Sequence, residues 1–247
     1  MNITVLTLNI WNIEGPVTAR FSALAKGLRL LRPDIVCLQE VSSDPQSARS
    51  QAALVAEYCD LAHCVKKDEL SIVSRYRTVG SDSATLPEFP GDWPRSVLLA
   101  EILVEGRSLL VANTHLAYRP EMILERKAHV EIVLAAIKRY GRMGGGSATI
   151  LCGDFNDVPS SPAVRLVLSS DQDFQDIYAR CHPHAPGFTY SCNNPYVDPS
   201  SNEDQRIDYI FASGGLIAKE CNVVFDGRND LDFVSDHFGV FGTLFLD

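Results

Sequence analysis

The sequence contains no apolar run of the roughly 20 residues that a membrane-spanning helix needs. Its first residues, MNITVLTLNIW, also lack the basic segment and the small-residue cleavage site of a secretory signal peptide. We therefore expect no transmembrane segment, and we interpret these first residues as a strand of the fold.

Paired cysteine motifs are missing too. The seven cysteines are an odd number, none forms a C-x-x-C pair, and Cys37 and Cys152 lie within apolar strand patterns. Such thiols are typical of a reduced, intracellular protein, so we predict a cytoplasmic location. The run CHPH from Cys181 to His184, with Cys192 further on, matches no common zinc spacing, and a zinc site there is the weaker interpretation.

Basic residues are too few for a broad nucleic-acid surface. Lys and Arg number 22 against 31 Asp and Glu, which gives a formal net charge of −9. Because neutralisation of phosphates by Lys and Arg dominates the affinity for nucleic acid, this balance argues against a protein that wraps a long duplex. A net negative charge is nevertheless compatible with a local basic groove.

What is present is the composition of an ordinary globular domain, with 247 residues, 46% hydrophobic and 21% charged. We predict a single domain over residues 1–247.

Hairpins interrupt a strict β-α-β order, as at Glu105-Gly106, which favours two packed β-sheets flanked by helices. Strand patterns occupy 3–11, 34–41, 70–79, 96–104, 108–116, 147–155, 205–213, 220–225 and 237–246, and helical patterns occupy 17–34, 45–58, 119–141 and 161–169.

Helix punctuation sets several expected boundaries. Pro33 should end the first helix, Pro120 should stand near the start of the long helix, and Gly141 should cap its C-terminus. The run Met143–Ser147, MGGGS, is predicted as a surface loop that joins this helix to the next strand.

Polar groups of one chemical kind stand at or near the ends of six apolar runs. They are carboxylate, amide or imidazole side chains, whereas ordinary turns would also supply Gly, Ser and Lys. We therefore expect them to converge on one site. The residues are Asn9, Glu40, His115, Asp154, Asn156, Asp208, Asp236 and His237.

These residue types suit the attack of water on a phosphate ester. Mg²⁺ prefers carboxylate and amide oxygens, and it polarises phosphoryl oxygens. A carboxylate can deprotonate the attacking water, and an imidazole held by a carboxylate can donate to the phosphate.

The ordered motifs TLNIW, LQEV, NTHL, GDFND, RIDYIF and SDHFGV resemble the endonuclease/exonuclease/phosphatase (DNase-I-like) superfamily. The resemblance runs from Thr7 to about Phe241. It implies an α/β fold, a four-layer α/β sandwich with two central, mainly antiparallel β-sheets flanked by helices. It also implies a metal-dependent phosphodiesterase or phosphatase.

The resemblance implies a Mg²⁺ site, at which Mn²⁺ is a possible substitute. Glu40 corresponds to the principal metal ligand, with Asn9 and Asp236 beside the ion.

Catalytic roles follow from the same resemblance. Asp154 would activate the water, Asn156 would hold the phosphate or the nucleophile, and His115 would contact a phosphate oxygen. His237 would stabilise the developing negative charge, oriented by Asp208.

Loops around the site carry the candidate substrate-binding residues. Arg95 and Arg119 are candidate phosphate clamps, because the arginine fork matches phosphate oxygens. The aromatic residues Trp93 and Tyr190 are candidates for contact with an organic group. The resemblance adds Tyr118 as a further substrate-binding candidate. Packing of long loops and surface solvation are the competing interpretations of these residues.

The motifs resemble two branches of the superfamily about equally. The run LNIW is similar to neutral sphingomyelinases, and WNI is similar to tyrosyl-DNA phosphodiesterases. We favour a small phosphate ester or a lipid head group as substrate, with nucleic acid as the alternative. A third hypothesis, a catalytically inactive binding module, is weaker because the metal-binding and water-activating residues are all present.

Overall fold

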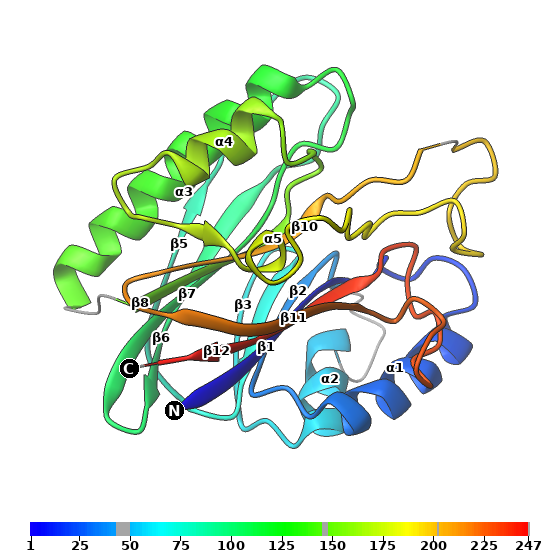
Figure 1. Ribbon diagram of the computed structural model, residues 1–247, viewed down its shortest axis with the longest axis horizontal. Coiled ribbons are helices and arrows are strands. Elements are labelled where there is room, and N and C mark those ends of the chain that lie inside the picture. The colour runs from blue at the N-terminus through cyan, green and yellow to red at the C-terminus, as the bar shows by residue number, and fades with distance from the viewer. Residues whose placement is uncertain (43–49, 145–147, 202, 247) are drawn as a thin grey trace.

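The computed structural model of the protein describes residues 1–42, 50–144, 148–201 and 203–246. In this part of the chain two six-stranded β-sheets pack face to face (Figure 1). The first sheet has the order β11-β12-β1-β2-β4-β3, and the second has the order β5-β6-β7-β8-β10-β9. The first sheet contains β1 (Asn2–Asn9), β2 (Ile35–Gln39), β3 (His63–Lys67), β4 (Leu70–Ser74), β11 (Ile217–Val224) and β12 (Gly239–Phe245). The second contains β5 (Arg77–Thr85), β6 (Ser96–Val104), β7 (Arg107–His115), β8 (Ala148–Asp154), β9 (Gln175–Asp176) and β10 (Asp208–Ser213).

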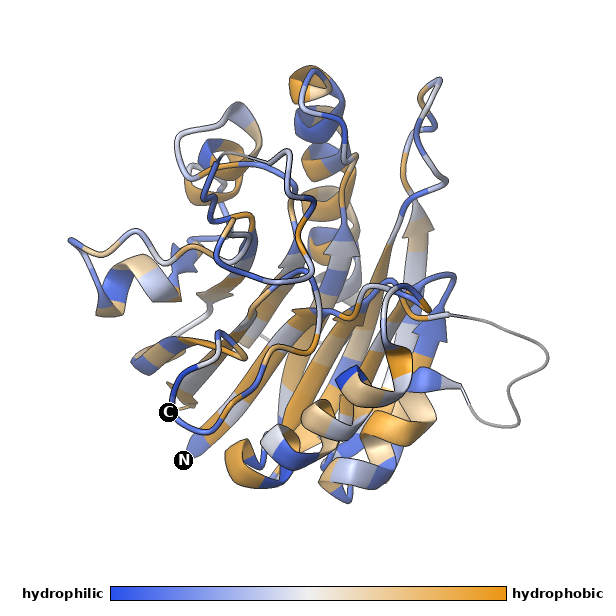
Figure 2. Cartoon of the chain, turned by 90° about the vertical axis from the view of Figure 1, so that its right-hand side faces the viewer, coloured by the Kyte–Doolittle hydropathy of each residue, from blue (hydrophilic) through white to orange (hydrophobic). Residues whose placement is uncertain are grey.

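Three hydrophobic cores separate four layers. The inner core lies between the sheets and includes Val5 and Ile150. The helices α1 (Val17–Leu31) and α2 (Gln51–Cys59) cover the outer face of the first sheet, and α3 (Ile123–Gly144) and α4 (Pro162–Leu168) cover that of the second. Figure 2 shows the apolar residues concentrated on the central strands. The predicted four-layer sandwich is confirmed.

Both sheets are mainly antiparallel, as predicted, and each contains one parallel pair. These pairs are β1 with β2 and β7 with β8. The predicted hairpin joins β6 to β7, with Val104 paired to Arg107. Both turn residues, Glu105 and Gly106, have positive φ, at 48° and 85°, as a tight two-residue hairpin requires.

The prediction of one strand over 70–79 is wrong. β4 ends at Ser74 in the first sheet, and β5 begins at Arg77 in the second. The chain changes sheet between them, where Arg75 donates its backbone N–H to Asp34 O and its side chain pairs with Asp34 Oδ1 at 2.9 Å. The polar residues of SRYR mark this crossing.

Several boundaries also differ from the predictions. Gly141 does not cap the long helix, which continues to Gly144, and α3 begins at Ile123 after a turn that includes Pro120. Residues 43–49 and 145–147 lie outside the described residues, so the start predicted at 45 and most of the MGGGS loop are not addressed. Hydrophobic periodicity does not reveal β3, β9 or the short helix α5 (Ile177–Cys181), because each is short or strongly polar.

Candidate active site

Strand register brings the polar strand ends to one rim of the sandwich. β1 and β2 run parallel, so Glu40 follows directly beyond the residue paired with Asn9. In the second sheet His115 at the end of β7 pairs with Asp154 at the end of β8. β10 runs antiparallel to β8, so its first residue, Asp208, also pairs with Asp154. Residues far apart in the sequence therefore meet through ordinary β pairing.

Asp154 is the centre of this rim and is 1% exposed. Its Oδ2 accepts a hydrogen bond from Asn9 Nδ2 at 3.1 Å and lies 3.4 Å from His115 Nε2 and 3.7 Å from His237 Nε2. Its Oδ1 accepts from the backbone N–H of Asn156 at 2.8 Å. Two hydrogen bonds thus fix the carboxylate, which lies between two imidazoles.

Gly153 allows this placement. Its φ is +144°, and a Cβ at this position would lie 1.9 Å from the carbonyl oxygen of Thr114. Any larger residue would push β8 away from β7 immediately before Asp154. The glycine of the GDFND motif therefore has a structural function.

His237 is held by a second carboxylate. Its Nδ1 lies 2.9 Å from Asp208 Oδ2, and both side chains are buried. Burial alone lowers the pKa of His237, but the charges of Asp208 and Asp154 outweigh it and raise that pKa well above its ordinary value. Burial raises the pKa of Asp208, although His237 opposes this. The pair holds a proton on the imidazole and directs Nε2 toward Asp154.

His115 also has a carboxylate beside it, that of Glu69, which is not among the residues predicted from the sequence. His115 Nδ1 lies 3.0 Å from Glu69 Oε1, and Arg95 Nη1 donates to the same oxygen at 2.9 Å. Burial tends to raise the pKa of Glu69, but His115 and Arg95 overcome it and lower that pKa to about 2. Glu69 stands at the start of β4, which runs antiparallel to β2, so this start reaches the same rim as Glu40. The sequence feature that could have indicated Glu69 is its position as a carboxylate immediately before a strand.

Replacing Glu69 with glutamine should reduce stability at neutral pH and have little effect near pH 2. The folded-state pKa of about 2 lies below the ordinary value of 4.5, so the carboxylate stabilises the fold fully above about pH 4.5 and loses this contribution as pH falls toward 2. We expect a difference on the order of 2 kcal/mol at pH 7 after allowance for partial exposure. Urea unfolding across this pH range measures it. The control is Glu88→Gln on an exposed side chain, and an equal pH dependence for both variants would contradict the prediction.

Glu40 and Asp236 bring two more carboxylates to the rim. Asn9 Nδ2 donates to Glu40 Oε1 at 3.0 Å, and Glu40 leaves β2 with a left-handed φ of 56°. Burial raises the pKa of Asp236, and the negative charge of Glu40 adds to this effect against the opposing charge of His237. The two carboxylates therefore repel each other, and a bound cation relieves such repulsion.

The loops beside these carboxylates are fixed by Arg20 of α1, which is 1% exposed. Its Nη1 donates to Ile10 O at 2.8 Å and to Val234 O at 2.9 Å, and its Nη2 donates to Glu14 O at 2.8 Å. Arg20 thus joins the segment after β1 to the segment before Asp236. Because main-chain carbonyls use its donors, its function here is to position the two loops.

The site opens into a cleft of about 1040 Å³. Most of the site residues predicted from the sequence line this cleft, namely Glu40, Trp93, Arg95, His115, Tyr118, Asp154, Asn156, Tyr190, Asp236 and His237. Asn9 and Asp208 lie behind it and hydrogen-bond to Asp154 and His237. Tyr190 packs its ring 5.3 Å from that of His237.

Protein groups already engage the two arginines that we predicted as phosphate clamps. The Arg95 side chain is 3% exposed and pairs with Glu69 and with Asp92 Oδ1 at 3.1 Å. Arg119 is absent from the cleft lining. Its Nε donates to Gly91 O at 2.6 Å and its guanidinium lies over the Tyr118 ring. Their function as clamps stays a prediction, and their contacts indicate that they fasten loops.

The cysteines are all free, and His182 contacts the carbonyl oxygen of Cys221. Among the described residues, the group with metal-ligand spacing is Asp154, Asp208 and His237, not the cysteine and histidine residues of CHPH. In the same part of the chain no helix is long and apolar enough to cross a membrane.

Several known proteins resemble this chain in sequence or in fold. It is 31% identical over 185 residues to protein angel homolog 1 of Rattus norvegicus, an alignment that covers 65% of this chain and 27% of that protein. It spans about a third of the length of the curated relatives it matches. TDP2 from C. elegans shares the fold with a TM-score of 0.82 at 20% identity, covering 100% of this chain and 76% of TDP2. A mannosyl-6-phosphatase of Bacteroides thetaiotaomicron has a TM-score of 0.76 at 21% identity, covering 99% of this chain and 100% of that one.

These structural likenesses show the fold alone, so the branch within the superfamily stays a prediction. The superfamily expected from the six ordered motifs is confirmed by a profile match that covers residues 6–237. Its ends coincide with the first and last of those motifs. The chain belongs to the Endonuclease/Exonuclease/phosphatase family.

Proposed function

We propose that this chain is a Mg²⁺-dependent hydrolase of phosphate esters in which Asp154 activates the attacking water. The observation that carries the proposal is the carboxylate of Asp154 lying between two imidazoles, each of which has a further carboxylate within 3.0 Å of its Nδ1. This arrangement can take a proton from water on one side and donate protons to phosphate oxygens on the other. Family membership and the cleft above Asp154 support it.

The donor set fits a hard divalent cation. Glu40 and Asp236 offer carboxylate oxygens at a place where their like charges repel. Asn9 is proposed as a third metal residue, although its Oδ1 accepts the backbone N–H of Trp11 and its amide nitrogen bridges Glu40 to Asp154. Mg²⁺ when bound would supply charge that polarises the phosphate, and Mn²⁺ would substitute.

A second position for an ion is less suitable. The ligand atoms of Asp154, Asp208 and His237 lie within 4.8 Å of one another. However, the hydrogen bond between His237 Nδ1 and Asp208 Oδ2 already uses one nitrogen and one carboxylate oxygen of the trio. We therefore assign this trio to proton handling and the Glu40–Asp236 pair to the metal.

The protein groups then have distinct roles. Asp154 orients and deprotonates the water, and His237 and His115 each donate from Nε2 to a phosphate oxygen. Asn156 lines the cleft beside Asp154 and is proposed to hold the phosphate. Glu69 orients His115, as Asp208 orients His237.

The alternative is a nuclease or a tyrosyl-DNA phosphodiesterase. It is favoured by a relative from Encephalitozoon cuniculi described as a probable 3'-5'-exoribonuclease subunit, and by D. rerio TDP2, which was crystallised with a single-stranded DNA product. The net charge of −9 favours a small phosphate ester or a lipid head group instead. A cytoplasmic location remains part of the proposal.

The test is hydrolysis of bis-p-nitrophenyl phosphate, a diester, and of p-nitrophenyl phosphate, a monoester, by the purified chain with Mg²⁺, with Mn²⁺ and with excess EDTA. We expect turnover with either ion and none after chelation. A panel of labelled oligonucleotides, run in parallel, distinguishes the nuclease. If the protein binds Mg²⁺ but hydrolyses none of these substrates, the inactive binding module is the better description.

A further inference from the structure

The cleft contains very little free positive charge. Among its described lining residues the lysine and arginine side chains are Lys67 and Arg95. Lys67 Nζ lies 3.3 Å from Asp68 Oδ1, and Arg95 is buried between two carboxylates. A nucleic-acid chain needs cations for the phosphates on either side of the reacting one. The cleft offers no such series of contacts within the described residues.

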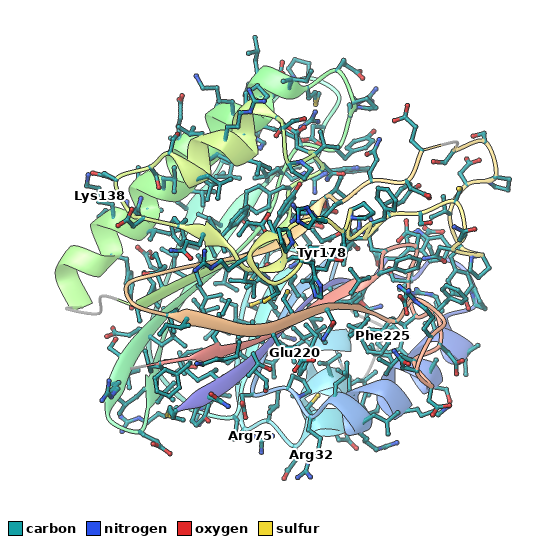
Figure 3. The ribbon with its side chains drawn as sticks, viewed as in Figure 1. Arg32, Arg75, Lys138, Tyr178, Glu220 and Phe225 are labelled. Carbon is teal, nitrogen blue, oxygen red and sulfur yellow. The ribbon has the colours of Figure 1, made fainter. Side chains whose placement is uncertain are left out.

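The acidic groups around the cleft strengthen this point. Its lining includes Glu14, Asp68 and Glu203 in addition to the carboxylates of the site. Two other basic residues, Arg32 and Arg75, lie far from the cleft. Figure 3 shows them at the edge of the molecule where β2 begins, and Glu40 follows the opposite end of that strand. A second phosphate near the reacting one would therefore meet repulsion.

One edge of the cleft is aromatic and exposed. Trp93 is 73% exposed and Tyr118 is 43% exposed, and both line the cleft together with Pro94 and Pro120. Tryptophan is highly buried on average, and exposed apolar residues that lie together mark interaction sites more often than single ones do. We call Trp93 and Tyr118 the aromatic ledge.

The ledge stands on segments that are tied together. Arg119 donates to Gly91 O at 2.6 Å and lies over Tyr118, so it links the loop of Trp93 to the loop of Tyr118. His129 of α3 contacts Pro87 O at 2.8 Å and fixes the start of the Trp93 loop. A pre-organised surface of this kind binds a ligand with little loss of conformational freedom.

The ledge is also connected to the catalytic groups. Trp93 lies between Asp92 and Arg95, which pair with each other, and Arg95 in turn holds Glu69 and hence His115. Tyr118 follows His115 by three residues. The organic group of an ester whose phosphate contacts His115 would therefore lie near the ledge.

From these observations we infer that the cleft recognises an ester with a single phosphate group, whose flat, uncharged ring rests on Trp93 and Tyr118. The inference rests on the proposed function and specifies its substrate class. An aryl group or one nucleobase supplies the same chemistry, whereas a polynucleotide does not fit. Trp93 and Tyr118 thus determine specificity and take no part in the proton transfers.

Three small diesters and one polymer test this substrate class. The diesters are methyl p-nitrophenyl phosphate, bis-p-nitrophenyl phosphate and thymidine 5′-p-nitrophenyl phosphate, and the polymer is a single-stranded oligonucleotide at low salt. The three diesters share the p-nitrophenyl leaving group, and methyl p-nitrophenyl phosphate lacks a second ring. The oligonucleotide contains the same phosphodiester linkage but carries many negative charges. We expect KM to be about tenfold lower for the diesters with a second ring, and no cleavage of the oligonucleotide. Preference for the aryl or the thymidine diester identifies the ring.

Substitutions then locate the ring. Trp93→Ala should raise KM about tenfold for the diesters with a second ring while kcat stays within about twofold, and Trp93→Phe should restore most of the loss. The control is Leu124→Ala, because Leu124 is also 73% exposed but lies outside the cleft lining. Thermal unfolding of each variant confirms that it is folded.

Binding without turnover gives an independent measurement. The Asp154→Asn protein is titrated with bis-p-nitrophenyl phosphate, whose nitrophenyl ring quenches tryptophan fluorescence. Both tryptophans, Trp11 and Trp93, line the cleft. We expect Trp93→Ala in this background to weaken binding about tenfold, with Leu124→Ala unchanged.

The outcomes separate the two proposals. If the wild-type chain hydrolyses neither a diester nor the monoester p-nitrophenyl phosphate in the presence of Mg²⁺, the proposed function fails. If it hydrolyses all the diesters with equal KM, or cleaves the oligonucleotide as readily, the substrate class is overturned and the hydrolase stands. Loss of binding in Leu124→Ala equal to that in Trp93→Ala would likewise overturn it.

Discussion

Replacing Asp154 with asparagine should reduce kcat about 10³-fold while the protein remains folded. The asparagine side chain keeps the size of the aspartate but cannot accept a proton from water, and general-base catalysis typically contributes this much. It also removes the charge that holds His115 Nε2 at 3.4 Å and His237 Nε2 at 3.7 Å. Steady-state hydrolysis of bis-p-nitrophenyl phosphate measures kcat, and circular dichroism reports on folding.

The matched control is Asp157→Asn, three residues further along the same loop. Asp157 is also buried, but its carboxylate pairs with Arg126 Nε at 3.0 Å and lies outside the cleft lining. Because it leaves the Arg126 charge without its partner, this substitution should lower stability by about 3 kcal/mol and leave kcat nearly unchanged at low temperature. An Asp154→Asn protein that retains full activity would exclude Asp154 as the base.

Replacing Glu40 with glutamine should abolish stabilisation by Mg²⁺. A ligand at one hundred times its Kd stabilises the folded state by about 2.7 kcal/mol, which corresponds to a rise in Tm of about 5–10 °C for a chain of this size. Without metal, the Glu40→Gln protein should be at least as stable as the wild type, because the charge that raises the pKa of Asp236 is gone. Thermal unfolding with and without Mg²⁺ measures both effects.

Glu14→Gln is the control for this experiment. Glu14 lines the same cleft and is exposed, and its backbone oxygen alone contacts Arg20. This variant should be stabilised by Mg²⁺ as strongly as the wild type. If Glu40→Gln retains the same metal-induced rise in Tm, the ion lies elsewhere, and the trio of Asp154, Asp208 and His237 becomes the site to examine.

The local chemistry of the site could be predicted because each polar group interrupts an apolar pattern. Asp208 within RIDYIF illustrates this, since an unpaired carboxylate in such a run would be costly to bury, and the structure pairs it with His237. Glu69 could not be found in this way. It precedes its strand and follows the charged run KKD, so it interrupts no apolar pattern. It reaches the site only because β4 runs antiparallel to β2.

The arginines show the limit of reasoning from residue type. Arg95 and Arg119 have the chemistry of phosphate clamps, but tertiary contacts decide what an arginine binds. Asp92 and Glu69 surround Arg95, and the carbonyl of Gly91 engages Arg119. No periodicity or spacing in the sequence indicates either of these contacts.

From the sequence alone, hydrophobic periodicity predicted most of the strands and the covering helices, because burial of apolar side chains depends on local period. The hairpins and the family resemblance indicated that the strands form two sheets. The ordered motifs determined the family and the polar groups at the strand ends. Only the tertiary structure decided that these groups surround Asp154 and that the aromatic ledge stands beside them. The physical reason is that strand order and register, which bring distant segments together, depend on the packing of the whole chain.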